Sequence, residues 1–342
     1  MKAMVLTELG AVSAGRDSLV LRDLPEPEPG EGEVLVRVAA CGVCHTELDE
    51  IEGRTPPPRL PVIPGHQVVG EVVARGRNTA GVEVGQRVGV AWIHSACGSC
   101  EHCIAGNENL CPGFRATGRD ADGGYAEYMT VPAGYAHPIP ASLTDVEAAP
   151  LLCAGAVGYR SLRLAGLRAG MRLGLTGFGA SAHLMLELVR RRHPGIEVHV
   201  FARKREEREF ALQMGATWAG DTSDTAPVKL HAIIDTTPAW LPVVKALENL
   251  EPGGRLVVNA IRKEETDKRQ LLGLDYAKHL WLEKEIKSVA NVARSDVREF
   301  LALAAGIPLR PVVETCGLHE ANRALRDLKL KHVRGAKVLC IR

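Results

Sequence analysis

The sequence has few aromatic residues, almost no net charge and no long apolar run, and each shortage excludes a class of partner. Aromatic side chains make up 4% of the 342 residues, too few for a platform on which nucleic-acid bases stack. A formal net charge of +1 gives no electrostatic reason to expect nucleic acid or an anionic membrane. No apolar run approaches the roughly 20 residues of a membrane span, and Thr7-Glu8 interrupts the apolar start of the chain. We therefore expect a cytoplasmic protein that binds neither nucleic acid nor a membrane.

The pattern of apolar residues changes near residue 155, and a chain of this length predicts two domains. Up to about residue 150, short alternating apolar stretches are separated by Gly and Pro, which predicts a β-rich first domain. Beyond residue 155, apolar strands alternate with helical stretches, which is typical of a parallel, doubly wound sheet. The strands predicted there are 171–176, 198–201, 232–235, 256–258 and 286–289. Helices are expected near 184–191, 204–214, 239–249, 294–305 and 319–330, and a last strand at 337–341 is expected to rejoin the first domain.

Four cysteines with the spacing C-x2-C-x2-C-x7-C lie in one short stretch of the first domain: Cys97, Cys100, Cys103 and Cys111. Four thiolates in one loop suit tetrahedral zinc and leave no open coordination position, so this site is expected to be structural. A zinc-ribbon module that binds nucleic acid is the alternative. The balanced charge of the chain and the lack of Lys, Arg and aromatic residues in the loop disfavour it.

Three further metal-ligand residues lie apart in the sequence. Cys44 belongs to the polar cluster that follows the apolar stretch 34–38, and His66 and Cys153 each stand in an apolar setting. We expect these three side chains to converge on a second metal ion.

A glycine turn lies between the predicted strand 171–176 and the helix that follows it. Gly177, Gly179 and Ala182 form the pattern G-x-G-x-x-A, in which the first glycine permits a tight turn and the second lets the backbone approach a pyrophosphate. Ala182 is small enough for close packing of helix on strand. The motif in this context predicts that a dinucleotide binds here.

The end of the second strand of this domain indicates which dinucleotide. An NAD site usually has Asp or Glu at this position, but the sequence here is Arg203-Lys204-Arg205. Arg203 and Lys204 suit a 2′-phosphate, since a guanidinium binds phosphate in bidentate fashion. We therefore predict a preference for NADP over NAD. The alternative is a solvated basic start of the next helix.

Together these motifs resemble the zinc-dependent alcohol dehydrogenases of the medium-chain dehydrogenase/reductase superfamily, along essentially the whole chain. The resemblance rests on Gly42-Val43-Cys44-His45-Thr46, Gly65-His66, the four-cysteine loop, Asp122-Gly123-Gly124-Tyr125-Ala126-Glu127-Tyr128, Leu152-Cys153-Ala154-Gly155 and the glycine turn. It implies a GroES-like catalytic domain (1–153 and 291–342) and a Rossmann cofactor domain (154–290), with the active site at their junction. It also implies two zinc ions per chain and hydride transfer between an alcohol, aldehyde or ketone and a nicotinamide cofactor.

The resemblance assigns roles to individual residues. Cys44, His66 and Cys153 would hold the catalytic zinc and leave its fourth position open. Thr46 matches the hydroxyl that takes the alcohol proton, and His45 matches a position beside the cofactor pyrophosphate. Trp92 resembles a wall of the substrate pocket, with an ordinary core tryptophan as the alternative.

Several positions depart from the family pattern. Glu47 stands where Asp usually orients a zinc ligand, and Asp49 stands where a histidine often ends the proton relay. Gln67 replaces a glutamate behind the zinc, and Val157 replaces a threonine near the nicotinamide. A catalytically silent relative that binds the nucleotide as a sensor or structural subunit is the alternative function. The family suggests a homodimer or homotetramer paired through the edge of the Rossmann sheet.

Overall fold

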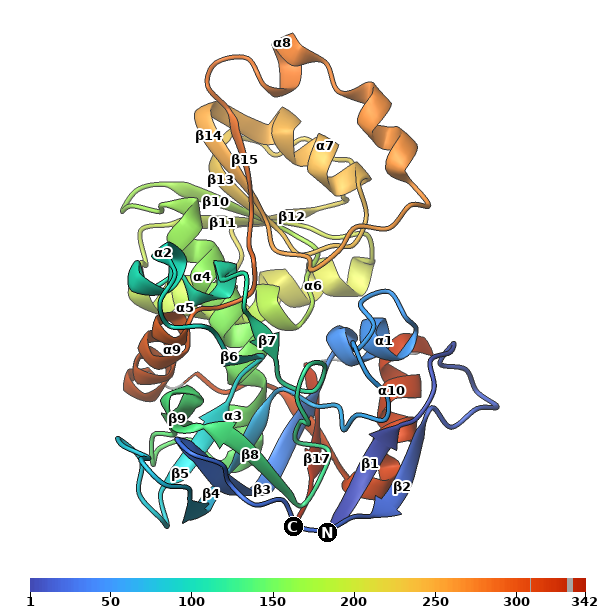
Figure 1. The fold of residues 1–342 in the computed structure, drawn as a ribbon. Helices are drawn as coiled ribbons and strands as arrows, with labels where there is room; N and C mark the ends of the chain where they lie inside the picture. The colour runs from blue at the N-terminus through green and yellow to red at the C-terminus, as the bar shows by residue number, and fades with distance from the viewer. Residues whose placement is uncertain (308, 331–334) are drawn as a thin grey trace. The chain divides into compact units, whose positions relative to one another are not determined.

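The computed structural model describes residues 1–307, 309–330 and 335–342, and the chain forms two compact units (Figure 1). The first unit comprises Met1–Ala156 and Val292–Arg342, and the second comprises Val157–Asn291. The first unit extends three residues beyond the predicted boundary at 153, and it contains Cys44, His66 and Cys153.

The first unit is built around β3 (Glu33–Val43), an 11-residue strand that pairs with β4, β8 and β17. Its seven-stranded sheet has the order β16-β17-β3-β4-β5-β9, and β8 pairs with β3 outside this path. The other strands of this sheet are β4 (Val68–Arg75), β5 (Arg87–Val90), β8 (Tyr128–Pro132), β9 (Ala136–Pro138), β16 (Val313–Gly317) and β17 (Ala336–Cys340). The red strand β17 runs antiparallel to the blue strand β3 in Figure 1, so the end of the chain rejoins the first domain as predicted.

Shorter elements complete the first unit. Two two-stranded sheets are formed by β1 (Lys2–Leu6) with β2 (Leu19–Asp23), and by β6 (Ile93–Ser95) with β7 (Arg115–Ala116). Its helical segments are α1 (His45–Ile51), α2 (Glu101–Ile104), η1 (Glu108–Leu110), η2 (Ala133–Tyr135), α3 (Asp145–Pro150), the π-helix η3 (Leu151–Gly155), α9 (Arg294–Gly306), η5 (Leu318–Glu320) and α10 (Ala321–Leu330). The helix α4 (Ala156–Ala165) follows η3 and leads into the second unit.

The second unit is a six-stranded parallel sheet with the order β12-β11-β10-β13-β14-β15. Its strands are β10 (Arg172–Thr176), β11 (Glu197–Phe201), β12 (Trp218–Gly220), β13 (Leu230–Asp235), β14 (Leu250–Val258) and β15 (Glu285–Ser288). The chain builds the sheet outward from β10 in one direction and then from β13 in the other. The strand order therefore reverses between β10 and β13, the place where open α/β sheets bind ligands.

Apolar side chains of this sheet pack against helices on both faces. Its helices are α4, α5 (Ala180–Arg192), α6 (Arg205–Gln213), α7 (Leu241–Asn249), η4 (Lys268–Gly273) and α8 (Tyr276–His279). One apolar cluster joins Leu175 of β10 to Met185 of α5, and a second joins Ile233 of β13 to Leu247 of α7. Strands covered on both faces are the arrangement of a doubly wound sheet, and this prediction is confirmed.

None of the described helices combines the length and the apolar character that crossing a membrane requires.

Candidate active site and metal centres

Cys44 lies at the start of α1, where it occupies the N-cap position with extended backbone dihedrals. Its Sγ accepts a hydrogen bond from the backbone N–H of Thr46 at 3.3 Å. In return, Oε2 of Glu47 accepts the backbone N–H of Cys44 at 2.9 Å. This is the reciprocal arrangement of a capping box, with a thiol in place of the usual hydroxyl. The two bonds fix the position of the thiol at the beginning of the helix.

Glu47 also orients His66. Oε1 of Glu47 lies 2.6 Å from Nδ1 of His66, and both side chains are buried. The other ring nitrogen, Nε2, lies 3.6 Å from Sγ of Cys44. A carboxylate on one imidazole nitrogen directs the other nitrogen toward a metal. Burial opposes a positive charge on His66, but the anionic neighbours Glu47 and Cys44 outweigh it and raise the pKa of the ring.

Cys153 completes the group from the π-helix η3, whose Leu151 and Leu152 are fully buried. The ligand atoms of Cys44, His66 and Cys153 all lie within 4.8 Å of one another. The hydrogen bond that the Cys44 thiol makes to Cys153, together with burial, raises the pKa of Cys44. A divalent cation would relieve this cost of ionisation. Two thiols and one imidazole are a ligand set that catalytic zinc uses with its fourth position open, so the residues fit this metal.

Three other predicted site residues belong to α1. Thr46 is buried beside Cys44, and His45 is exposed at the first position of the helix. Asp49 is 3% exposed, and its Oδ1 accepts a hydrogen bond from Nε of Arg54 at 2.5 Å. The carboxylate of Asp49 is therefore held in an ion pair, and its role as the end of a proton relay stays a prediction.

Trp92 contacts two other side chains. Its ring packs against Phe114 with a centroid distance of 4.8 Å, and the guanidinium of Arg119 lies 5.6 Å above it. The indole N–H is buried. These contacts are compatible with Trp92 as a wall of the substrate pocket and with Trp92 as an ordinary core residue. Its role in the substrate pocket therefore stays a prediction.

Sequence reasoning missed Glu50, a third acidic residue of α1. Its side chain is buried, and burial together with the negative charge of Glu47 raises its pKa to about 8. Residues three apart lie on the same side of a helix, so the spacing from Glu47 was a usable signal. The neighbouring departure, Gln67, is also buried. Its side chain packs against Gly42, where an added Cβ would lie 2.6 Å from Oε1 of the amide.

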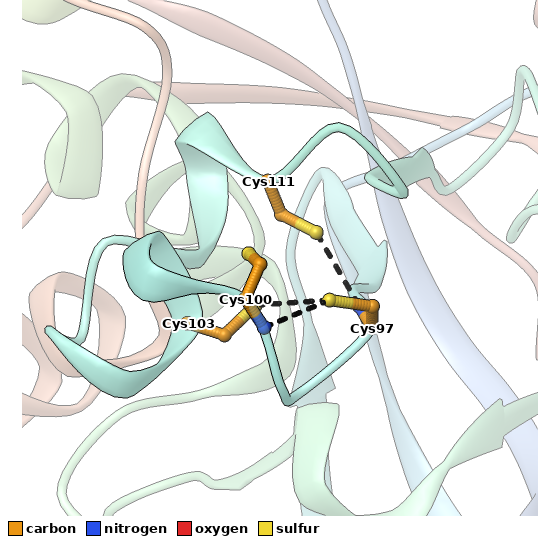
Figure 2. A group of neighbouring side chains, drawn as sticks. All are labelled: Cys97, Cys100, Cys103 and Cys111. Atoms are coloured by element: carbon orange, nitrogen blue, oxygen red, sulfur yellow. Dashed lines mark hydrogen bonds between the residues drawn. The ribbon is translucent and has the colours of Figure 1, made fainter.

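The four cysteines of the second metal group face a common space, as Figure 2 shows. The sulfur atoms of Cys97, Cys100, Cys103 and Cys111 lie within 4.8 Å of one another. Backbone N–H groups support the sulfurs, with Cys100 N donating to Cys97 Sγ at 3.3 Å and Gly113 N to Cys111 Sγ at 3.2 Å. Backbone N–H groups of Ser99 and Cys100 lower the pKa of Cys97 to about 6. Burial instead raises the pKa of Cys103 to about 12, so the loop favours the thiolate at Cys97 and not at every cysteine. Four thiols around one space are the ligand set of tetrahedral zinc.

The glycine turn has the predicted strand–turn–helix form. Gly177 follows β10 with φ +77°, a conformation that favours glycine. Gly179 is the N-cap of α5, and a Cβ added there would meet no atom within 4 Å. Ala182 is fully buried in the core between α5 and the sheet. The turn thus offers backbone N–H groups and free space at a helix start, as dinucleotide binding requires.

The basic residues after β11 differ in their partners. Arg205 donates to Oε1 of Glu209 at 2.7 Å, and Arg208 donates to Oδ2 of Asp221 at 3.1 Å. Arg203 and Lys204 are exposed, and within the described part of the chain neither side chain has an ion pair.

Comparison with known proteins places this geometry in a family. Residues 30–141 match the alcohol dehydrogenase GroES-like domain. The chain is 44% identical over 346 residues to the "Probable alcohol dehydrogenase AdhA" of Mycobacterium tuberculosis (strain CDC 1551 / Oshkosh), covering 100% of this chain and 97% of that protein. It belongs to the zinc-dependent alcohol dehydrogenases. This enzyme is also 35% identical to an alcohol dehydrogenase of Geobacillus stearothermophilus, over 99% of this chain and 98% of that protein.

The structure of the alcohol dehydrogenase agrees with the sequence comparison. It superposes on a crystal structure of an NAD-dependent alcohol dehydrogenase with a TM-score of 0.86 and 25% identity, covering 100% of both chains. The enzyme is a medium-chain dehydrogenase/reductase that transfers hydride between an alcohol or carbonyl compound and a nicotinamide cofactor. The catalytically silent alternative has no support among these relatives.

Proposed function

We propose that the enzyme holds a catalytic zinc with Cys44, His66 and Cys153 and a structural zinc with the four-cysteine loop. The observation that carries this proposal is the convergence of each ligand set within 4.8 Å. When bound, the catalytic zinc would polarise the oxygen of an alcohol, aldehyde or ketone and lower the pKa of the alcohol. Glu47 would keep Nε2 of His66 directed at the metal. The hydroxyl of Thr46 would accept the alcohol proton, and Trp92 would contact the substrate.

Metal analysis tests this assignment. The purified enzyme is expected to contain about two zinc ions per chain. Cys153→Ser is expected to contain about one zinc ion and to lose activity while keeping its fold. Cys100→Ser is the matched variant at the other site, and it is expected to lose the other zinc ion together with thermal stability. A single zinc ion in the parent enzyme, retained by Cys153→Ser, would contradict the catalytic site.

For the cofactor, the proposal is NADP rather than NAD, with its 2′-phosphate bound by Arg203 and Lys204. These two cations follow β11 and have no ion pair within the described ranges, whereas Arg205 and Arg208 are engaged by carboxylates. The phosphate would thus not have to displace an existing partner. The backbone at Gly177 and Gly179 would bind the pyrophosphate by donating N–H groups to it, with the exposed His45 beside it.

Steady-state kinetics with both cofactors tests this choice, using a panel of primary and secondary alcohols, aldehydes and ketones. The parent is expected to have a higher kcat/KM for NADPH than for NADH. A hydrogen bond to a charged group contributes about 1.5–3 kcal/mol, so Arg203→Ala is expected to lower kcat/KM for NADPH about tenfold or more and to spare NADH. Arg191→Ala is the control, because it removes a cation at the far end of α5 that is paired with Glu187. A strong NADH preference of the parent would refute the proposal.

The enzyme is further proposed to form a homodimer through β15, with a homotetramer as a larger assembly of such pairs. β15 is the edge strand of its sheet, and its residues are all exposed. Ile286 on this strand is 48% exposed, and Trp281, which precedes the strand, is 55% exposed. An open edge with apolar side chains is a surface on which a second strand pairs. Light scattering is expected to give twice the chain mass or a multiple of it, and Ile286→Lys is expected to give monomers; a monomeric parent would contradict the proposal.

A further inference from the structure

A buried ion pair lies where the strand order of the second unit reverses. Thr176 is the last residue of β10, Asp235 is the last residue of β13, and the two are directly paired in the sheet. Lys263, which follows β14, forms an ion pair with Asp235. The side chains of Asp235 and Lys263 are 0% and 8% exposed. The reversal point is where this sheet type binds its ligand, and neither residue is among the proposed zinc ligands or cofactor contacts.

The carboxylate and the ammonium of this pair are both hydrogen-bonded to side chains and backbone of neighbouring segments. Oδ1 of Asp235 accepts the hydroxyl of Thr176 at 2.5 Å and the hydroxyl of Thr237 at 2.8 Å. The ammonium of Lys263 donates to Oδ2 of Asp235, to the carbonyl of Thr237 at 2.7 Å and to the carbonyl of Ala239 at 3.0 Å. A lysine ammonium has three N–H donors, so all of them are satisfied. One carboxylate and one ammonium thus tie together the ends of β10 and β13 and the segment after β14.

The tied segments lie directly against the glycine turn. A Cβ added at Gly177 would lie 2.9 Å from Oγ1 of Thr236 and 2.9 Å from Cγ2 of Thr237. The backbone N–H and the hydroxyl of Thr236 both donate to the carbonyl of Thr176, at 3.0 and 2.9 Å. Further along, the backbone N–H of Glu264 donates to the carbonyl of Pro238 at 2.8 Å. Displacement of these loops would therefore move the turn that is proposed to bind the pyrophosphate.

Stability alone does not explain such a pair. Burying two charges costs desolvation energy, and neutral replacements of similar volume are often as stable. A buried pair can instead select one arrangement of the segments it joins. We propose that Asp235 and Lys263 are positioning residues for the nicotinamide dinucleotide, which keep the loops at the reversal point in the arrangement that the cofactor binds. The inference rests on the proposed function, since it needs the dinucleotide to bind at the glycine turn.

The experiment compares dinucleotide affinity with stability in three variants of the full-length, zinc-loaded enzyme. Lys263→Met leaves the Asp235 charge buried, and Asp235→Asn/Lys263→Met removes both charges while the asparagine oxygen can still accept from Thr176 and Thr237. Lys268→Met is the control, because it removes an exposed lysine of the same region that is paired with Glu265. The dissociation constants of NADPH and NADH are measured by nicotinamide fluorescence, together with the Tm without nucleotide, the zinc content and the kinetic constants.

The double variant separates positioning from stability. If the binding arrangement falls to a tenth of the molecules, the dissociation constant rises about tenfold. We expect this rise in both Lys263 variants, with a raised KM for the dinucleotide, kcat at saturation within about twofold of the parent and unchanged zinc content. The Tm is expected to drop in Lys263→Met and to recover in the double variant, while the affinity does not recover. Affinity that recovers together with Tm, or that never changes, would overturn this inference. A parent that binds neither dinucleotide would refute the proposed function as well.

Discussion

Replacing Glu47 by glutamine tests how the catalytic metal site is supported. Glu47 is fully buried, and its two oxygens serve two different donors. Oε1 lies 2.6 Å from Nδ1 of His66, and Oε2 accepts the backbone N–H of Cys44 at 2.9 Å. Both His66 and Cys44 are proposed zinc ligands, so one carboxylate orients two ligands at once.

The size of the effect follows from this geometry. Glutamine has the same shape, but its amide has one acceptor oxygen and one NH2 group. It can accept from only one of the two donors, and the other then faces an N–H group without an acceptor. An unsatisfied buried polar group costs about 1–3 kcal/mol, which corresponds to a loss of about 5- to 150-fold in zinc affinity. Measured effects of such supporting residues, about 10- to 100-fold, fall in the same range.

Chelator competition measures this loss. The zinc retained by each variant is titrated against a chromogenic chelator at neutral pH. Glu47→Gln is expected to release one zinc ion at a lower chelator concentration, and the four-cysteine zinc serves as the internal control because none of its ligands contacts Glu47. Glu47→Asp retains the charge and is expected to bind zinc more tightly than Glu47→Gln. Parental affinity in Glu47→Gln would refute the reasoning.

Three further predictions concern other buried groups. Gln67→Glu is expected to keep two zinc ions per chain and to alter kcat; loss of the catalytic zinc in this variant would show that the role given to residue 67 is wrong. Burial lowers the pKa of His137 to about 3, below the ~6.5 of an unfolded chain, so the parent loses stability as pH falls from about 6.5 toward 3. His137→Gln is expected to remove this loss, which amounts to up to about 1.4 kcal/mol of unfolding free energy per pH unit. Chemical unfolding at several pH values measures it, and equal pH slopes in both proteins would contradict the prediction. Arg294 donates to the buried Glu108 at 2.7 Å, so Arg294→Met is expected to lower the free energy of unfolding by about 3 kcal/mol. The double variant Glu108→Gln/Arg294→Met is expected to recover most of this loss. An unchanged Tm in the single variant would contradict the prediction.

Local features of the sequence were enough for the architecture. The parallel sheet was predicted because apolar periodicity and turn residues act over a few neighbouring positions, and the strands at 172–176, 197–201 and 230–235 lie close to their predicted places. The structural metal loop was likewise readable, since its four cysteines lie within 15 residues of chain. The short helix α1 and the π-helix η3 were not predicted. Each is too short to show helical periodicity.

The sites that depend on distant segments needed the tertiary structure. Cys44, His66 and Cys153 come from α1, from the segment before β4 and from η3, and only the resemblance to a family supported the expectation that they meet. The pairing of Asp235 with Lys263 across 28 positions leaves no periodic signal in the sequence. The sequence by itself determined the layers of the fold, the four-cysteine loop and the glycine turn, because their information is local. Only the tertiary structure shows that the charges of Asp235 and Lys263 are buried together, because this depends on which strand ends become neighbours in the sheet.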